Sequence, residues 1–202
     1  MKKKLALLFA LVAWFAVIAQ FILMMQNSAT SIPETIIRFF SYFTILTNTL
    51  VAIYFSCIFF VKNQKKLINK PGVLTAITIY IVMVGLVYQI ALRHLWQPQG
   101  LQMAVDELLH SVIPILVIIF WSMYESVKPV NYSQILKWTI YPLLYLIFIL
   151  VRGIFSNFYP YPFVDVVNIG IAKTLTNSAI LLLMFMIMSV FFLFVGKSII
   201  KR

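Results

Sequence analysis

Charged residues are scarce in this chain. Only 10% of its 202 residues are Asp, Glu, Lys or Arg, and only five are acidic, whereas 63% are hydrophobic. About a quarter of the residues of a soluble globular domain are charged, because its surface must be wetted by water. The composition therefore excludes a soluble protein and predicts an integral membrane protein.

Cysteine, histidine and glycine are also rare, and each shortage excludes a class of site. The single cysteine, Cys57, cannot form an intrachain disulfide. Glu107 and His110 have the Glu-x-x-His spacing of carboxylate di-metal bundles, but such bundles need a second copy and further glutamates. The six glycines form no phosphate-binding loop. We therefore expect no metal and no other cofactor.

Long apolar stretches dominate the rest of the chain. About 20 apolar residues in a helix cross the ~30 Å hydrocarbon layer, and a helix satisfies its own backbone hydrogen bonds in lipid. The first stretch outlasts the ~7–15 apolar residues of a signal peptide, so we expect it to be retained. The sequence predicts an all-α, polytopic membrane protein, a single domain over 1–202, with six transmembrane helices in one bundle at about 5–25, 36–61, 73–92, 107–124, 135–151 and 172–195.

The basic residues are distributed unevenly between the two sides of the predicted bundle. One side has four, Arg38, Arg93, Arg152 and Lys173. The other side has twelve, namely Lys2, Lys3, Lys4, Lys62, Lys65, Lys66, Lys70, Lys128, Lys137, Lys197, Lys201 and Arg202. Cytoplasmic loops carry the excess of Lys and Arg, so both termini are predicted to be cytoplasmic. Because these residues are dispersed over short loops, they indicate membrane lipids as partners and no nucleic acid.

A polar stretch, "SYFTILTNTL" at residues 41–50, interrupts the second apolar run. Within it Ser41, Thr44 and Asn48 are spaced i, i+3 and i+7, which places them on one face of a helix. Counted from the outer end of that helix, the face lies in the outer leaflet. The hydroxyls could instead bond back to their own helix or join neighbouring helices.

His110 lies about one turn inside the fourth predicted helix, with Asp106 one turn before it. An ionisable side chain in a membrane helix is a functional candidate by default. Pro114 cannot donate a hydrogen bond, and its ring clashes with the carbonyl four residues earlier, which is that of His110. We expect the helix to bend there and to leave that carbonyl free. The alternative is that His110 only fastens this helix to the second one.

Helices 2 and 4 both run inward from the outer face, so Thr44 and His110 can stand at similar depth. Such a pair would supply a hydroxyl nucleophile and a base, with Asp106 holding the imidazole tautomer. Asn48 or Asn177 could donate a hydrogen bond to an oxyanion. The outer arginines Arg38, Arg93 and Arg152 suit a carboxylate or phosphate headgroup.

The last outer loop, "RGIFSNFYPYPFVDV", is rich in aromatic residues and contains Pro160 and Pro162. Each proline fixes its own φ and restricts the preceding tyrosine to extended geometry, so we expect a stiff loop. It could serve as a lid over the outer end of the bundle or as an interfacial aromatic belt.

Four motifs, "YFTILTN", "LLHSVIP" with Trp121 beyond it, "YPLLYLIFILVRG" and "YPYPFVDV", resemble a bacterial family of uncharacterised six-helix membrane proteins. More distantly, the chain is similar to the androgen-induced protein family, membrane hydrolases that cleave fatty-acid esters of hydroxy fatty acids with an intramembrane threonine and histidine. The resemblance places Thr44, after Tyr42 and Phe43, as the threonine and His110 as the histidine. Thr47, one turn on, is the next candidate nucleophile.

These observations predict a hydrolase of lipid esters, with a fatty-acyl ester as ligand, in a cavity of the outer leaflet. The resemblance implies a multi-pass protein of the bacterial plasma membrane. Two alternatives stay open. One is a non-enzymatic lipid or amphiphile binding protein or carrier, in which the same polar groups hold a headgroup. The other is a structural membrane subunit whose polar residues only join helices.

Overall fold

The computed structural model describes residues 1–61, 70–127 and 129–198, and the regular structure in these ranges is helical. Six helical spans are long and apolar enough to cross a membrane, which confirms the predicted all-α, polytopic fold. They are α1 (Lys2–Asn27), α3 (Phe43–Phe60), α4 (Val73–Val87) with the π turn η2 (Tyr88–Leu92), α5 (Gly100–Glu107) with η3 (Leu108–Val112) and α6 (Ile113–Tyr124), α7 (Gln134–Trp138) with α8 (Ile140–Ser156), and α10 (Ile171–Ser198). The protein is therefore a multi-pass membrane protein.

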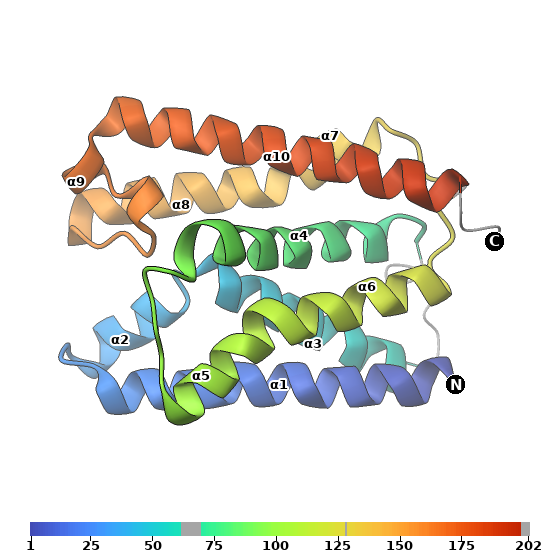
Figure 1. Cartoon of the computed structure of the whole chain (residues 1–202), viewed down its shortest axis with the longest axis horizontal. Coiled ribbons are helices and arrows are strands. Elements are labelled where there is room, and N and C mark those ends of the chain that lie inside the picture. Colours follow the sequence, from blue (N-terminus) through green and yellow to red (C-terminus); the bar gives the residue numbers. More distant parts are fainter. Residues whose placement is uncertain (62–69, 128, 199–202) are drawn as a thin grey trace.

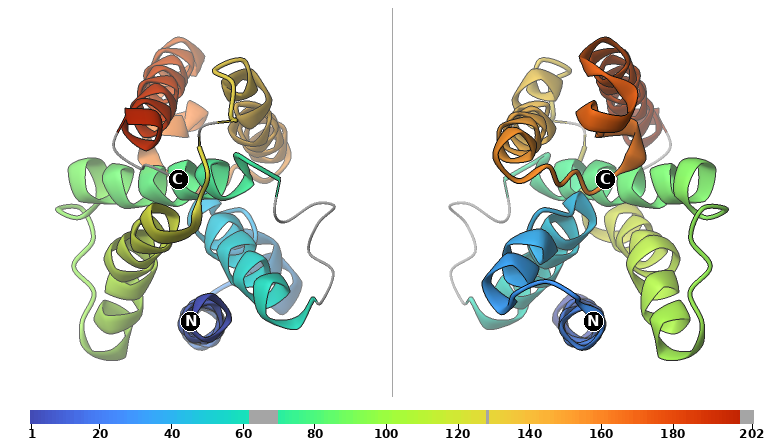
Figure 2. Two further views of the ribbon diagram at one scale, coloured as in Figure 1. Left: turned by 90° about the vertical axis from the view of Figure 1, so that its right-hand side faces the viewer. Right: turned by 90° about the vertical axis from the view of Figure 1, so that its left-hand side faces the viewer.

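Helix α4 forms the centre of the bundle (Figures 1 and 2). Helices α1, α3 and α6 pack on one side of it, and α8 and α10 lie on the other. Of the 18 most apolar consecutive residues in each span, 72% are buried in the span that contains α4 and 17% in the span that contains α8. Helix α8 thus has most of its surface uncovered by the described residues, whereas α4 contacts protein on nearly every side.

An aromatic cluster fastens α1, α3 and α6 together. Phe9, Phe55 and Phe120 meet edge to face, with ring centroids 4.9 to 6.0 Å apart. All three side chains are buried. Edge-to-face pairs contribute about 0.5–1.5 kcal/mol beyond the area they bury, so this cluster stabilises one half of the bundle.

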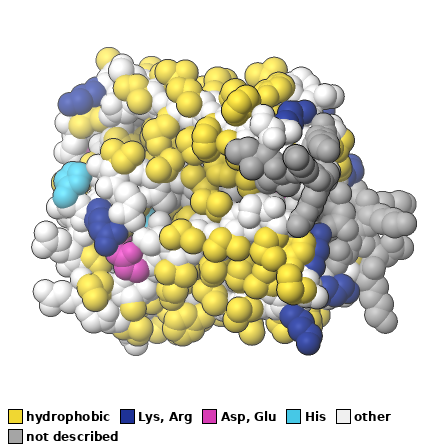
Figure 3. All heavy atoms as spheres, turned by 45° about the vertical axis from the view of Figure 1, so that its right-hand side comes forward, with side chains coloured by type: hydrophobic (Ala, Val, Ile, Leu, Met, Phe, Trp, Pro, Cys, Tyr) yellow, Lys and Arg dark blue, Asp and Glu magenta, His cyan; other side chains and the backbone are white. Residues whose placement is uncertain are grey.

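Helix α1 begins and α10 ends at the same end of the bundle, as six spans require (Figure 1). The described lysines of the predicted cytoplasmic side belong to segments at this end: Lys2, Lys3, Lys4, Lys70, Lys137 and Lys197. Lys62, Lys65, Lys66, Lys128, Lys201 and Arg202 lie outside the described residues. The space-filling view shows hydrophobic side chains over the middle of one face and Lys and Arg towards its ends (Figure 3).

The predicted helix over 36–61 is wrong in one respect, because two helices cover this stretch. Helix α2 (Ile32–Phe39) ends, Tyr42 adopts an extended backbone with φ −83° and ψ 125°, and α3 begins at Phe43. The Tyr145 hydroxyl on α8 donates to the Ser41 carbonyl at 2.8 Å within this break. Ser41 and Thr44 therefore do not share a helix face. Thr44 is the second residue of α3, where backbone N–H groups have no partner in their own helix.

Among the other predicted boundaries, the third span covers 73–92 as predicted, and the fourth ends at Tyr124 as predicted, whereas the remaining ones shift outward without changing the number of spans. The first helix runs from Lys2 to Asn27, the fourth span begins at Gly100, the fifth continues to Ser156, and the sixth covers Ile171–Ser198. The last outer connection is shortened to 157–170 and contains the turn η4 (Pro162–Val164) and the short helix α9 (Val166–Ile169).

Candidate functional site

Thr44 and His110 meet at the start of α3. The Thr44 hydroxyl oxygen Oγ1 lies 3.3 Å from His110 Nε2, and both side chains are largely buried. This separation is at the long end of hydrogen bonding, as is common for catalytic pairs without a ligand. The structure thus brings together the two residues that the sequence predicts as nucleophile and base.

Asp106 holds the other side of the imidazole. His110 Nδ1 lies 2.9 Å from the Asp106 backbone carbonyl and 3.3 Å from its carboxylate Oδ1. A carbonyl oxygen only accepts hydrogen bonds, so Nδ1 carries the proton and donates it. In this tautomer the lone pair of the ring is on Nε2. The atom that faces the Thr44 hydroxyl is therefore the basic nitrogen.

Backbone geometry positions His110. The histidine lies within η3, where the Ile113 N–H bonds to the Leu108 carbonyl five residues earlier. Pro114 follows at the start of α6, as expected for a local break in the helical ladder. Tyr88, in the π turn η2, stacks on the His110 ring with centroids 4.1 Å apart and planes 16° apart. Single π turns inside α-helices are frequent at functional sites.

Tyr161, in the last outer connection, is a site residue that the sequence analysis missed. The backbone N–H of Thr44 donates to the Tyr161 hydroxyl at 3.2 Å, and Thr44 Oγ1 lies 3.3 Å from the same oxygen. The Tyr161 ring packs edge to face on Tyr42 and stacks on Phe163. The doubled Tyr-Pro motif indicates a stiff loop, but nothing in it connects Tyr161 to a residue 117 positions earlier.

The two asparagines make contacts other than those expected of oxyanion donors. Asn48 is buried, and its Nδ2 donates to the carbonyls of Thr44 and Leu109 at 2.9 and 3.3 Å. Both of its amide protons are thus directed to the backbone. Asn177 donates to the Phe163 carbonyl at 2.9 Å. In this geometry Asn48 connects α3 to the His110 segment, and Asn177 anchors η4 to α10.

The remaining hydroxyls of "SYFTILTNTL" have separate roles. Ser41 Oγ donates to the Ile37 carbonyl at 2.7 Å, a bond back to its own chain. Thr47 Oγ1 lies 3.1 Å from the Tyr141 hydroxyl on α8. Thr49 Oγ1 is buried without a hydrogen-bond partner among the described residues. Within this stretch the hydroxyl that meets His110 is that of Thr44.

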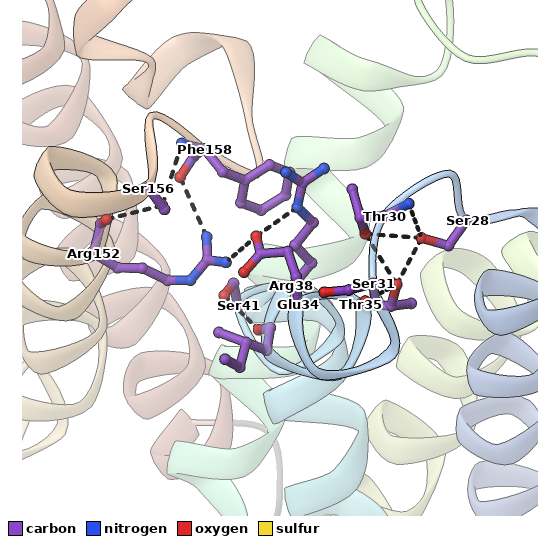
Figure 4. Close-up of polar contacts among 11 residues, drawn as sticks. Ser28, Thr30, Ser31, Glu34, Thr35, Arg38, Ser41, Arg152, Ser156 and Phe158 are labelled. Atoms are coloured by element: carbon purple, nitrogen blue, oxygen red, sulfur yellow. Dashed lines mark hydrogen bonds and ion pairs between the residues drawn. The ribbon is translucent and has the colours of Figure 1, made fainter.

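Two of the three predicted headgroup arginines converge at the outer end (Figure 4). Glu34 Oε1 accepts from Arg38 Nε at 2.7 Å and from an Arg152 terminal nitrogen at 2.8 Å. The Phe158 ring lies 4.5 and 4.9 Å from the two guanidinium carbons. The hydrogen bond from Arg38 and then that from Arg152 lower the pKa of Glu34 below its ordinary value. Arg93 instead pairs with Glu107, away from this cluster.

Two cavities meet at Thr44. The larger, about 700 Å³, has a polar part lined by Gln20, Asn27, Arg38, Gln102, Asp106 and His110. The smaller, about 290 Å³, is mainly apolar and lies among residues of α3, α4, α8 and α10. Thr44, Leu92 and Tyr161 line both. Of the three arginines, Arg38 lines the larger cavity, and Arg93 and Arg152 are outside its lining.

A second feature of the larger cavity is an unpaired acceptor. Asp106 Oδ2 is buried and has no hydrogen-bond partner among the described residues. In the part of the chain that the structure describes, no three His, Cys, Asp or Glu side chains are grouped so that they could hold a metal ion. The site therefore presents a hydroxyl, an imidazole, a phenol and a carboxylate to whatever enters the cavities.

No family model, curated protein or solved structure matches this chain.

Proposed function

We propose that this protein hydrolyses lipid esters within the membrane, with Thr44 as the nucleophile and His110 as the general base. One observation carries the proposal: His110 Nε2 lies 3.3 Å from the Thr44 hydroxyl oxygen, while Nδ1 lies 2.9 Å from the Asp106 carbonyl, an acceptor that favours the proton on Nδ1. In nucleophilic acyl transfer, a base orients the nucleophilic hydroxyl, and a third group orients that base. Thr44, His110 and Asp106 have this arrangement.

The chemistry balances with these groups and water alone. Thr44 Oγ1 bonds to the ester carbonyl carbon as its proton passes to His110 Nε2, and the carbonyl electron pair moves onto oxygen. The intermediate expels the alcohol oxygen, which takes the proton from Nε2 and leaves an acyl-Thr44 ester. Water, deprotonated by Nε2, then attacks that ester and releases the acid and free Thr44. The products are one carboxylic acid and one alcohol.

The two cavities suit the two halves of such a substrate. The apolar cavity between α8 and α10 matches an acyl chain, and α8 lies where lipid can approach it. The larger cavity has polar side chains and Arg38, whose terminal nitrogens make no hydrogen bond to the described residues. Arg38 can therefore bind an anionic group on the alcohol half, such as a carboxylate or phosphate.

The resemblance to the androgen-induced protein family supports the same chemistry, since it rests on Tyr42, Phe43 and Thr44 together with His110. From the resemblance to the bacterial membrane family we place the protein in a bacterial plasma membrane. The excess of lysine at the end with both termini supports a cytoplasmic location for them.

Labelling with a fluorophosphonate probe tests the proposal, because the probe reacts with activated hydroxyl nucleophiles. The full-length protein in detergent should be labelled on Thr44, and Thr44→Ala and His110→Ala should each abolish labelling while keeping a monodisperse, folded protein. Thr47→Ala is the matched control, because Thr47 contacts Tyr141 instead of His110. Labelling that survives both Thr44→Ala and His110→Ala would overturn the mechanism, and loss in Thr47→Ala alone would move the nucleophile to Thr47.

The apolar cavity also favours a second candidate, a lipid binder or carrier that cleaves nothing. Such a protein should co-purify with intact lipid, identified by mass spectrometry, and lose it on Arg38→Gln. Incubation of the wild type with candidate lipid esters should then yield no free acid. Release of free acid that requires Thr44 would support the hydrolase and contradict the binder or carrier.

A further inference from the structure

We propose that Tyr161 is a third catalytic residue, which donates the hydrogen bond that stabilises the oxyanion formed when Thr44 attacks an ester. This inference rests on the proposed hydrolase function and deepens it. Of the two residues expected in this role, Asn48 directs both amide protons to backbone carbonyls, and Asn177 donates to the Phe163 carbonyl and lines neither cavity. The Tyr161 hydroxyl, in contrast, lies beside the reacting oxygen.

The direction of the hydrogen bonds follows from counting donors and acceptors. The Thr44 N–H has a proton to give, so the Tyr161 oxygen accepts from it at 3.2 Å. The Thr44 hydroxyl gives its own proton to His110 Nε2, since Nδ1 already carries the imidazole proton. Thr44 Oγ1 is then the acceptor for the phenolic proton, 3.3 Å away. The protons therefore point from Tyr161 to Thr44, from Thr44 to His110, and from His110 to Asp106.

The Tyr161 hydroxyl keeps its proton at neutral pH and remains a donor. Burial raises the pKa of Tyr161 to about 12, while hydrogen bonds from the backbone of Thr44 and of Phe43 act in the opposite direction. Those bonds come from the first residues of α3, where the helix dipole favours negative charge. A donor polarised in this way strengthens as charge develops on its acceptor.

The position of Tyr161 at both cavities places its hydroxyl where a bound ester would present its carbonyl group. Tyr161 and Thr44 both line the apolar and the polar cavity. An ester with its acyl chain in one and its alcohol half in the other must present its carbonyl carbon to Thr44 Oγ1 between them. The carbonyl oxygen then comes within reach of the Tyr161 hydroxyl, which donates to it while the charge forms. The proton stays on Tyr161 throughout.

Tyr161 would also have a purely structural role if it only accepted the hydrogen bond from the Thr44 N–H. That N–H, at the start of α3, has no partner within its own helix. The chain offers a matched control for this alternative. Tyr159 is the preceding tyrosine of the same Tyr-Pro-Tyr-Pro motif, and its ring packs against Gly153 on α8. Tyr159→Phe and Tyr161→Phe remove the same atom from the same loop, but only the second removes a group next to Thr44.

The test compares rate constants of fluorophosphonate labelling for wild type, Thr44→Ala, Tyr159→Phe and Tyr161→Phe, together with the melting temperature of each. We expect Tyr161→Phe to label about 10²–10³-fold more slowly, the usual cost of one oxyanion donor, and Tyr159→Phe to label like the wild type. Wild-type labelling of Tyr161→Phe, with labelling still lost in Thr44→Ala, overturns the inference and leaves the proposed function standing. Wild-type protein that shows no Thr44-dependent labelling overturns both.

A second variant covers the case in which Tyr161→Phe does not fold. Difluorotyrosine at position 161 keeps the ring and the hydroxyl but makes the phenol more acidic. Its labelling rate should begin to fall at a lower pH than in the wild type, because the ionised phenol can no longer donate. The same replacement at position 159 should leave the pH profile unchanged. Identical profiles for wild type and the variant at 161 contradict the inference.

Discussion

Gly85 lies directly against the backbone carbonyl of His110. A Cβ atom at position 85 would stand 2.9 Å from that carbonyl oxygen and 3.4 Å from the Pro114 ring. Pro114 has no N–H to bond to this carbonyl, so α4 can approach the helix at the point where its ladder is broken. The absence of a side chain at Gly85 therefore sets how closely the central helix packs against the segment that carries His110.

We expect Gly85→Ala to push α4 away from η3 and to displace His110 relative to Thr44. Overpacking of this kind costs about 1–3 kcal/mol, and a shift of the base should also slow Thr44 labelling. Thermal unfolding in detergent and the labelling rate are the two measurements, and Gly85→Val should show both effects more strongly. A Gly85→Ala variant with wild-type melting temperature and labelling would contradict this packing.

Filling the apolar cavity should distinguish long from short acyl groups. Ala179 on α10 lines this cavity, and Ala179→Phe adds a ring that competes with an acyl chain for the same space. We expect labelling by a long-chain alkyl fluorophosphonate to fall, while a short-chain probe still reacts. Ala172, two turns earlier on α10, lies outside the lining, so Ala172→Phe is the control. Equal loss with both probes would mean that the ring disturbs Thr44 itself.

Stability should decrease in acid because of Glu34. The hydrogen bond from Arg38, then that from Arg152, hold the folded-state pKa of Glu34 below its ordinary value of 4.5. The unfolded chain therefore binds this proton more readily, so the stabilisation is complete above pH 4.5 and is lost as the pH falls through the lowered pKa. Melting temperatures measured from neutral pH to below 4.5 should fall less steeply in Glu34→Gln than in the wild type.

The arginine partners supply the matched comparison for that experiment. Arg38→Gln removes the larger cause of the lowered pKa and should flatten the acid dependence more than Arg152→Gln. The two arginines contact the same carboxylate oxygen and the same Phe158 ring, so their effects should not simply add. Parallel acid melting curves in wild type and Glu34→Gln would show that this pair of contacts does not matter to stability.

The six spans could be predicted from the sequence because hydrophobicity is a property of each local stretch. Residues 73–92, for example, cannot be wetted and are long enough to cross the hydrocarbon layer in any fold. Pro114 likewise predicts a broken ladder at His110, because the missing N–H belongs to the residue itself. These features depend on no distant partner, and the structure contains both.

The break at Tyr42 could not be predicted in this way. Residues 34–61 contain no proline and no glycine, the residues that most strongly indicate the end of a helix. The break is held by contacts with distant residues, among them the bond from Tyr145 on α8 to the Ser41 carbonyl. As a consequence, Thr44 stands at the start of α3, where its N–H donates to the Tyr161 hydroxyl.

By itself, then, the sequence determined the membrane class, the number of spans and the candidacy of Thr44 and His110, since each depends on a residue type and its near neighbours. The tertiary structure alone decided that Thr44 Oγ1 and His110 Nε2 are 3.3 Å apart, that Asn48 donates to the Leu109 carbonyl, and that the Tyr161 hydroxyl contacts Thr44. Those relations join residues 61 to 117 positions apart. Helix packing sets such distances, and no local pattern encodes them.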